Sequence, residues 1–221
     1  MFYQVHPYKP FIPKGATKLI VGTLPPPRFS TGNLKKGDVN FCYGSIDGQL
    51  WKILDELFTL KLHFETTDFA IEQRKDFLIR NKIGICDIVE SCERKKMDAS
   101  DLGMENIALR DLLFYIKNNT SVDTLLLTGG NSKNGPGHHL RRQLKEKNIT
   151  LKLISAETPK IYEFEFNENE IPRKIKVIVL TAPSGSANRA VGSNPQYQQL
   201  KKQHPKFNTF DFRVLQYKKF F

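Results

Sequence analysis

Short apolar runs alternate with longer amphipathic segments along the chain. Three of the runs are largely apolar without polar alternation, which is typical of strands that are buried on both faces of a sheet. They predict strands at residues 18–22, 122–127 and 175–180. Apolar residues at helical spacing, together with capping residues, predict helices at residues 49–60, 72–80, 105–117 and 137–147.

Shorter β-type runs complete the pattern. They lie at residues 83–89, as a strand or the turn after one, and at 150–155, 160–166 and 208–217, with a turn at 167–170. The alternation predicts a three-layer α/β/α fold around a mostly parallel four-stranded sheet, with an additional β-hairpin. We expect a single domain over residues 1–221, in which residues 194–221 form a basic, aromatic C-terminal extension.

The composition agrees with one globular domain, because 39% of the 221 residues are hydrophobic. No apolar run reaches the roughly 18 residues that a membrane span requires, and residues 1–14 lack the apolar core of a secretory signal. Cys42, Cys86 and Cys92 fit neither a disulfide framework nor a metal-binding spacing. We expect a cytoplasmic protein, and a monomer, with no membrane contact, no bound metal and no cofactor.

The charge balance is strongly basic. Lys and Arg number 34 against 23 Asp and Glu, which gives a formal net charge of +11. Such a surplus favours a polyanionic partner, because each cation that neutralises a phosphate releases a condensed counterion. The charge therefore favours nucleic acid as the partner, and a basic surface that serves solubility alone is the alternative.

Small residues follow each of the three predicted strands. The loops at residues 22–27, 128–132 and 181–189 are rich in Gly, Pro and Ser, which lets backbone N–H groups approach a ligand closely. In open parallel sheets ligands bind outside the carboxyl ends of the strands. The chain has no Walker loop, no GxGxxG fingerprint and no GxSxG elbow, so nucleoside triphosphate hydrolysis and α/β-hydrolase chemistry are disfavoured.

Five segments also follow one another in a familiar order. They are GTLP at residues 22–25, FCYGS at 41–45 before Leu50-Trp51, DIVESCER at 87–94, TG at 128–129 and PSGSANR at 183–189. Together they resemble the uracil-DNA glycosylase superfamily, nearest to its mismatch-specific and hypoxanthine-directed branches. The last segment is one residue shorter than the family's second motif.

The resemblance implies a DNA glycosylase of base excision repair that flips a deaminated base (uracil, hypoxanthine or xanthine) out of DNA and hydrolyses its N-glycosidic bond. The DNA would be double-stranded with a lesion, or single-stranded. By resemblance, the base pocket comprises Gly22, Thr23, Leu24, Pro25 and Tyr43. Tyr43 would stack on the flipped base, and a core aromatic beside Phe41 is the alternative.

The DNA-binding loop implied by the resemblance comprises Pro183, Ser184, Gly185, Ser186, Asn188 and Arg189. It would enter the minor groove and bind phosphates beside the flipped nucleotide. A simple strand-to-helix connection with Ser as the N-cap is the alternative. The basic residues 138–142 are a second candidate DNA contact, although a solvated helix face explains them better.

Both catalytic Asn positions of the family carry other residues, namely Leu24 and Gly48. Asp47 and Gln49 flank the second position and are the candidate catalytic residues, with Asp47 positioning water or stabilising charge on the sugar. The alternative is that Asp47-Gly48 forms a tight turn and N-cap. Asp87 suits a buried orienting role. Because both Asn residues are absent, a catalytically impaired DNA- or lesion-binding protein of the same fold is the alternative function.

Overall fold

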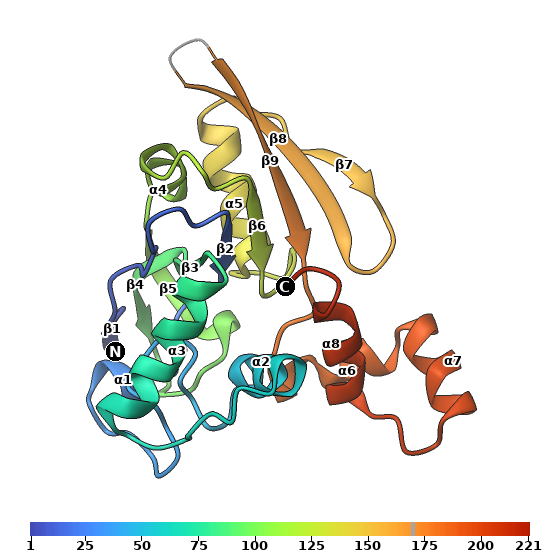
Figure 1. Cartoon of the computed structure of the whole chain (residues 1–221). Helices are drawn as coiled ribbons and strands as arrows, with labels where there is room; N and C mark the ends of the chain where they lie inside the picture. Colours follow the sequence, from blue (N-terminus) through green and yellow to red (C-terminus); the bar gives the residue numbers. More distant parts are fainter. Residues whose placement is uncertain (169–170) are drawn as a thin grey trace.

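The chain forms an α/β structure with two sheets (Figure 1), and the computed structural model describes residues 1–168 and 171–221. The larger sheet has six strands in the order β3 (Ile83–Ile85), β2 (Lys18–Val21), β6 (Thr124–Leu127), β9 (Ile171–Val179), β8 (Lys160–Glu168) and β7 (Lys152–Ser155). The four strands β3, β2, β6 and β9 pair in parallel. β8 pairs antiparallel with β9, and β7 pairs antiparallel with β8. The predicted α/β class is confirmed, and the sheet is mixed.

The smaller sheet is antiparallel and was not predicted. Its strand order is β1 (Phe2–Val5), β4 (Val89–Arg94) and β5 (Met104–Leu109). Residues 87–94, which carry one of the family-like segments, therefore lead from the main sheet into the centre of the second sheet.

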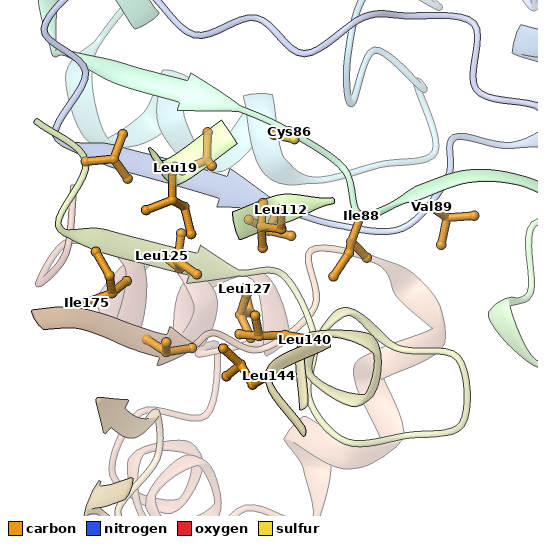
Figure 2. Close-up of a cluster of buried hydrophobic side chains, with 14 of the residues drawn as sticks. Leu19, Cys86, Ile88, Val89, Leu112, Leu125, Leu127, Leu140, Leu144 and Ile175 are labelled. Atoms are coloured by element: carbon orange, nitrogen blue, oxygen red, sulfur yellow. The ribbon is translucent and has the colours of Figure 1, made fainter. Parts of the chain in front are cut away.

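Helices cover both faces of the main sheet. Leu19 of β2 and Leu125 of β6 pack under α4 (Leu112–Asn118) and α5 (Pro136–Glu146), in the cluster drawn in Figure 2. The next residue of each strand, Ile20 and Leu126, points to the other face and joins α2 (Leu50–Phe58), α3 (Asp68–Arg80) and α8 (Thr209–Tyr217). Each strand thus buries both of its faces, which is why its sequence shows no polar alternation.

The remaining helices are short or lie near the C-terminus. They are α1 (Pro27–Ser30), α6 (Asn188–Gly192), α7 (Pro195–Gln203) and the 3₁₀ turns η1 (Asp101–Gly103) and η2 (Gly185–Ala187). α8 packs on α2, and α6 packs on both α7 and α8. Among the described residues, none of the helices has the length and apolar character needed to pass through a bilayer.

Two predicted elements are wrong. The predicted helix at 105–117 is strand β5 in its first part, because those residues pair with β4, and α4 begins only at Leu112 with Asp111 as its N-cap. The predicted strand at 208–217 is helix α8, which Asn208 and Asp211 start with a reciprocal capping box. Its buried residues Phe212, Arg213, Gln216 and Tyr217 recur at helical spacing.

Other boundaries differ less. The helix predicted at 72–80 starts earlier, at Asp68, where the Thr67 hydroxyl accepts a hydrogen bond from the Ala70 N–H. The run at 83–89 divides into β3, a connection and the start of β4. The predicted hairpin is β8–β9, which continues the main sheet. Part of its predicted turn, residues 169–170, lies outside the described residues.

Candidate functional site

The three Gly/Pro/Ser-rich loops start from neighbouring strands at one edge of the main sheet. The Thr128 N–H donates to the Val21 carbonyl, and the Leu180 N–H donates to the Leu127 carbonyl, both at 2.9 Å. The loops after β2, β6 and β9 therefore begin side by side. This convergence is what a site at the carboxyl ends of parallel strands requires.

Gly22 is the first residue after β2 at this edge. A Cβ atom built at this position would lie 2.2 Å from the Tyr43 hydroxyl and 2.8 Å from Asp87 Oδ1. The Gly22 N–H donates to the same Asp87 Oδ1 at 2.9 Å, and its carbonyl accepts from the Ile88 N–H. Only glycine leaves the space that these groups occupy.

Tyr43 reaches this edge from the loop before α2. Its hydroxyl lies 3.0 Å from Thr128 Oγ1, and its backbone has the positive φ of 57° that non-glycine residues seldom adopt. Burial raises the pKa of the phenol well above its usual value, and the nearby Asp87 charge adds to this. The ring is half-buried and packs against the α2-side cluster, so it combines a core contact with a place at the strand ends.

Asp87 holds two separate segments in place. Oδ1 accepts from Gly22, and Oδ2 lies 3.0 Å from His6 Nε2, with both side chains buried. Both carboxylate oxygens are therefore engaged within the protein. Asp87 is thus buried, as its surroundings suggested, and its orienting role stays a prediction.

Asp101 is a candidate functional residue that sequence reasoning missed. Its Oδ1 accepts a hydrogen bond from Thr23 Oγ1 at 2.8 Å, and burial raises the pKa of the carboxyl to about 6. Arg94 supports its loop by donating to Gln4 Oε1 and to the Ser100 carbonyl, each at 2.6 Å. A partly buried carboxyl with a raised pKa beside the predicted base-pocket loop is a candidate acid or base. No local pattern marks Asp101, because its burial depends on the second sheet.

The rest of the first loop is fixed by its neighbours. Leu24 is half-buried against the α5-side cluster, and the Pro25 carbonyl accepts from Gln4 Nε2 at 2.8 Å. In the described part of the chain, no hydrogen bond engages the backbone N–H of Thr23 or Leu24. These two donors are therefore unpaired within the described structure.

Asp47 lies in a cluster of ionic contacts. Its side chain is 61% exposed, and Oδ2 lies 3.1 Å from both Arg28 Nη2 and Lys35 Nζ. Arg28 also holds the buried Asp38 with two hydrogen bonds, at 2.7 and 2.9 Å. The Gly48 N–H donates to the Ser45 carbonyl, so Asp47 and Gly48 do form a tight turn, while the N-cap position of α2 belongs to Gln49.

Gln49 joins the predicted catalytic segment to the predicted DNA-binding loop. Its backbone N–H donates to the Pro183 carbonyl at 2.9 Å, and Gly48 forms an antiparallel bridge with Ser184. Its side-chain Oε1 is buried and has no hydrogen-bond partner among the described residues. A buried acceptor left in this state is costly unless water or a ligand supplies a donor.

The 183–189 loop presents its polar groups outward. Pro183 is buried, whereas Gly185, Ser186, Asn188 and Arg189 are exposed. The Ser184 and Ser186 hydroxyl oxygens lie 2.8 Å apart, and Ser184 makes no side-chain capping bond within the described structure. The Ser N-cap alternative thus loses its expected hydrogen bond.

Arg213, which the sequence analysis did not single out, shapes this loop from α8. Its fully buried guanidinium donates to the carbonyls of Ala182 and Ser184, both at 2.8 Å, and to Asn188 Oδ1 at 3.0 Å. The loop backbone is therefore held rigidly from beneath, while its hydroxyls and Arg189 face outward.

The second candidate DNA contact, residues 138–142, is largely engaged within the fold. His139 and Leu140 are buried, Arg141 lies over the Tyr162 ring, and Arg142 pairs with Glu146.

A hollow of about 720 Å³ lies away from the strand ends, between α4, β7 and β8, and Phe114, Lys147 and Phe166 contribute to its wall. None of its lining residues belongs to the strand-end loops.

The part of the chain that the structure describes contains no group of three or more His, Cys, Asp or Glu side chains suited to hold a metal ion. Comparison of the chain with protein-family models, with curated proteins and with solved structures finds no match.

Proposed function

We propose that the chain is a DNA glycosylase-like protein that flips a deaminated base, uracil or hypoxanthine or xanthine, and hydrolyses its N-glycosidic bond in base excision repair. The observation that carries this proposal is the contact of Gln49 with Pro183, at 2.9 Å between N–H and carbonyl oxygen. This contact joins the candidate catalytic segment to the candidate DNA-binding loop, beside the strand ends where Tyr43 and Gly22 meet.

The leaving base is the first group that the site must stabilise. As the bond from the sugar C1′ to the base nitrogen breaks, its electron pair moves onto the base and a positive charge develops on the sugar. The free N–H groups of Thr23 and Leu24 are suited to bind an oxygen of the anionic base. The Tyr43 ring would stack on the base, which contributes about 1–3 kcal/mol in comparable complexes.

The sugar and the attacking water are the second requirement. In this proposal the Asp47 carboxylate stabilises the positive charge on the sugar or positions the water that attacks C1′. The water oxygen bonds to C1′, and the proton that the water loses neutralises the released base anion. The unpartnered Gln49 Oε1 accepts a hydrogen bond from substrate or water. Ser184, Ser186 and Arg189 would bind the phosphates that flank the flipped nucleotide.

A catalytically impaired DNA- or lesion-binding protein of the same fold is the second candidate function. The observation that favours it is the position of Asp47 between two cations, Arg28 and Lys35, each 3.1 Å away. Cations so close to the carboxylate weaken its interaction with a developing positive charge. Leu24 and Gly48 at the family's Asn positions favour the same function.

Duplex oligonucleotides that each carry one uracil, hypoxanthine or xanthine test the proposal, with abasic product read as alkali-labile strand breaks. We expect product from the natural protein, a loss of at least about 100-fold in Asp47→Ala, and an unchanged rate in Asp76→Ala, whose carboxylate is exposed on α3. Tight lesion binding without product would establish the second function. Product that survives Asp47→Ala would assign the catalytic role to another group.

A further inference from the structure

We propose that residues 195–206, named here the C-terminal arm, bind the phosphate backbone of duplex DNA beside the lesion. The arm consists of α7 and the turn that follows it. This inference rests on the proposed function for its choice of partner, and it extends the contact from the 183–189 loop along the duplex.

The charge of the C-terminal part of the chain is the first observation. Residues 181–221 contain seven Lys and Arg but a single acidic residue, Asp211. Their net charge of +6 is more than half of the chain's +11. Asp211 is already used, since its carboxylate accepts from the Asn208 N–H in the capping box of α8.

The cations of the arm are exposed, and the described part of the chain offers them no acidic partner. Lys201, Lys202 and Lys206 are exposed, and among the described residues no carboxylate forms an ion pair with them. The one hydrogen bond made by their ammonium groups within that part of the chain runs from Lys201 Nζ to the Pro205 carbonyl at 2.6 Å. Elsewhere, Lys35, Lys75, Lys95 and Lys174 pair with Asp or Glu side chains.

The burial of α7 is the second observation. Within the described structure, none of its nine residues is buried, so the helix contributes little to the core. Tyr197 and Leu200 are half-buried and the other residues of the helix are exposed, so α7 buries only a narrow apolar face. It is nevertheless anchored, because the Tyr197 ring lies 6.0 Å from that of Phe207 and 5.8 Å from that of Phe212 on α8.

The arm continues directly from the candidate DNA-binding loop. The 183–189 loop leads into α6, which packs on both α7 and α8. In Figure 1, α7 is the outermost element on this side of the molecule, beyond α6 and α8. Arg213 fixes the loop and Tyr197 fixes the arm to the same helix, α8, so the two are held in one arrangement. A rigid basic surface beside a lesion-binding loop suits the regularly spaced phosphates of a duplex.

The salt dependence of binding to a short undamaged duplex DNA, measured by fluorescence anisotropy, tests the arm without requiring catalysis. The test variant is Lys201→Gln/Lys202→Gln/Lys206→Gln. The control is Lys152→Gln/Lys160→Gln/Lys176→Gln, which removes the same charge from exposed positions on β7, β8 and β9. We expect the slope of log K against log salt to become shallower by about 2–3 in the test variant, roughly 0.9 for each phosphate that the arm no longer neutralises. Affinity at low salt should fall at least tenfold or so, and the control should keep the natural slope.

A second variant, Lys201→Arg/Lys202→Arg/Lys206→Arg, preserves the charge and should keep the natural slope. An unchanged salt slope in the Gln variant, or an equal change in the β-strand control, would overturn the proposal that the arm binds DNA, even if the natural protein cleaves lesion-bearing DNA. If the natural protein cleaves no lesion but the salt slope becomes shallower in the Gln variant alone, DNA binding by the arm is supported and the glycosylase proposal fails. A natural protein that binds duplex RNA but not duplex DNA would overturn both.

Discussion

The backbone N–H of Gln49 donates a hydrogen bond to the carbonyl of Pro183 across 2.9 Å. These residues are more than 130 positions apart in the chain. The bond connects the start of α2 with the loop after β9, so the turn of Asp47 and Gly48 and the hydroxyls of Ser184 and Ser186 belong to one surface. A substitution at the start of α2 is therefore expected to disturb the 183–189 loop, and a substitution in that loop to disturb the start of α2.

Gly22→Ala tests the crowding at the strand ends. The new methyl would lie 2.2 Å from the Tyr43 hydroxyl, so Tyr43 must move. We expect a loss of about 1–3 kcal/mol in the free energy of unfolding, measured with urea, because overpacking of this kind forces neighbours from their positions. Gly192→Ala is the matched control, because its methyl would enter open space, and its unfolding free energy should change by less than about 0.5 kcal/mol. Equal stability of the two variants would contradict the geometry described for Gly22.

Tyr43 variants separate the ring from the hydroxyl. Tyr43→Phe keeps the ring and removes the hydroxyl that meets Thr128, whose own hydroxyl still has the Val21 carbonyl as a partner at 3.3 Å. We expect Tyr43→Ala to weaken binding of a lesion-bearing duplex by roughly 1–3 kcal/mol, the contribution of one stacked base, and Tyr43→Phe to retain most of the affinity. Binding to an undamaged duplex, measured in parallel, should be the same for both variants. Equal lesion binding by Ala and Phe variants would remove Tyr43 from the pocket.

Asp101→Asn should change how stability depends on pH. The pKa of this carboxyl is about 6 in the folded chain and about 3.9 in an unfolded one. Between these values the folded state binds more protons, so stability falls as pH rises from about 4 to 6. Asn keeps an acceptor for Thr23 without the charge, and should equal or exceed the natural stability at neutral pH by up to about 3 kcal/mol. Asp76→Asn on the exposed face of α3 is the control. A less stable Asn variant at neutral pH would show that the ionised form is held favourably.

His139→Leu should change the pH dependence of stability in the opposite direction to Asp101→Asn. Burial lowers the pKa of His139 to about 4, and a backbone contact with Asn134 opposes this shift. Neither ring nitrogen makes a hydrogen bond of ordinary geometry among the described residues. An unfolded His titrates near pH 6.5, so the unfolded state binds more protons between about 4 and 6.5 and stability falls as pH falls through this window. The Leu variant should lose this slope and, because an unpaired buried polar group is removed, gain about 1–2 kcal/mol at neutral pH.

The exposed neighbour His138 provides the control for this prediction, because His138→Gln alters a solvated side chain. The Asp101 and His139 windows overlap with opposite signs, so the natural protein should show a flatter acid profile than either single variant. Urea unfolding at closely spaced pH values measures all of these profiles. A Leu variant that keeps the full slope of the natural protein would mean that another group causes it.

Several parts of the fold could be predicted because they depend on local pattern. β2, β6 and β9 are apolar runs buried on both faces, and the Gly, Pro and Ser residues that follow them mark the loops at their carboxyl ends. The α/β class derives from these runs, whereas the candidate residues Gly22, Tyr43 and Ser184 come from the resemblance of the five segments to a known superfamily. The error at α8 has a local cause as well, since its aromatic residues favour a strand when the Asn208 cap is overlooked.

The environments of several side chains in the candidate site depend on contacts between segments that are distant in the sequence. The sequence by itself determined which segments are buried strands, where their loops lie and that the surface is basic, because periodicity, turn composition and charge are properties of neighbouring residues. The tertiary structure decided that Asp47 lies between Arg28 and Lys35, that Asp101 reaches Thr23, and that Arg213 supports the 183–189 loop. Burial and charge pairing depend on which segments are in contact, and these contacts form only when the whole chain is folded.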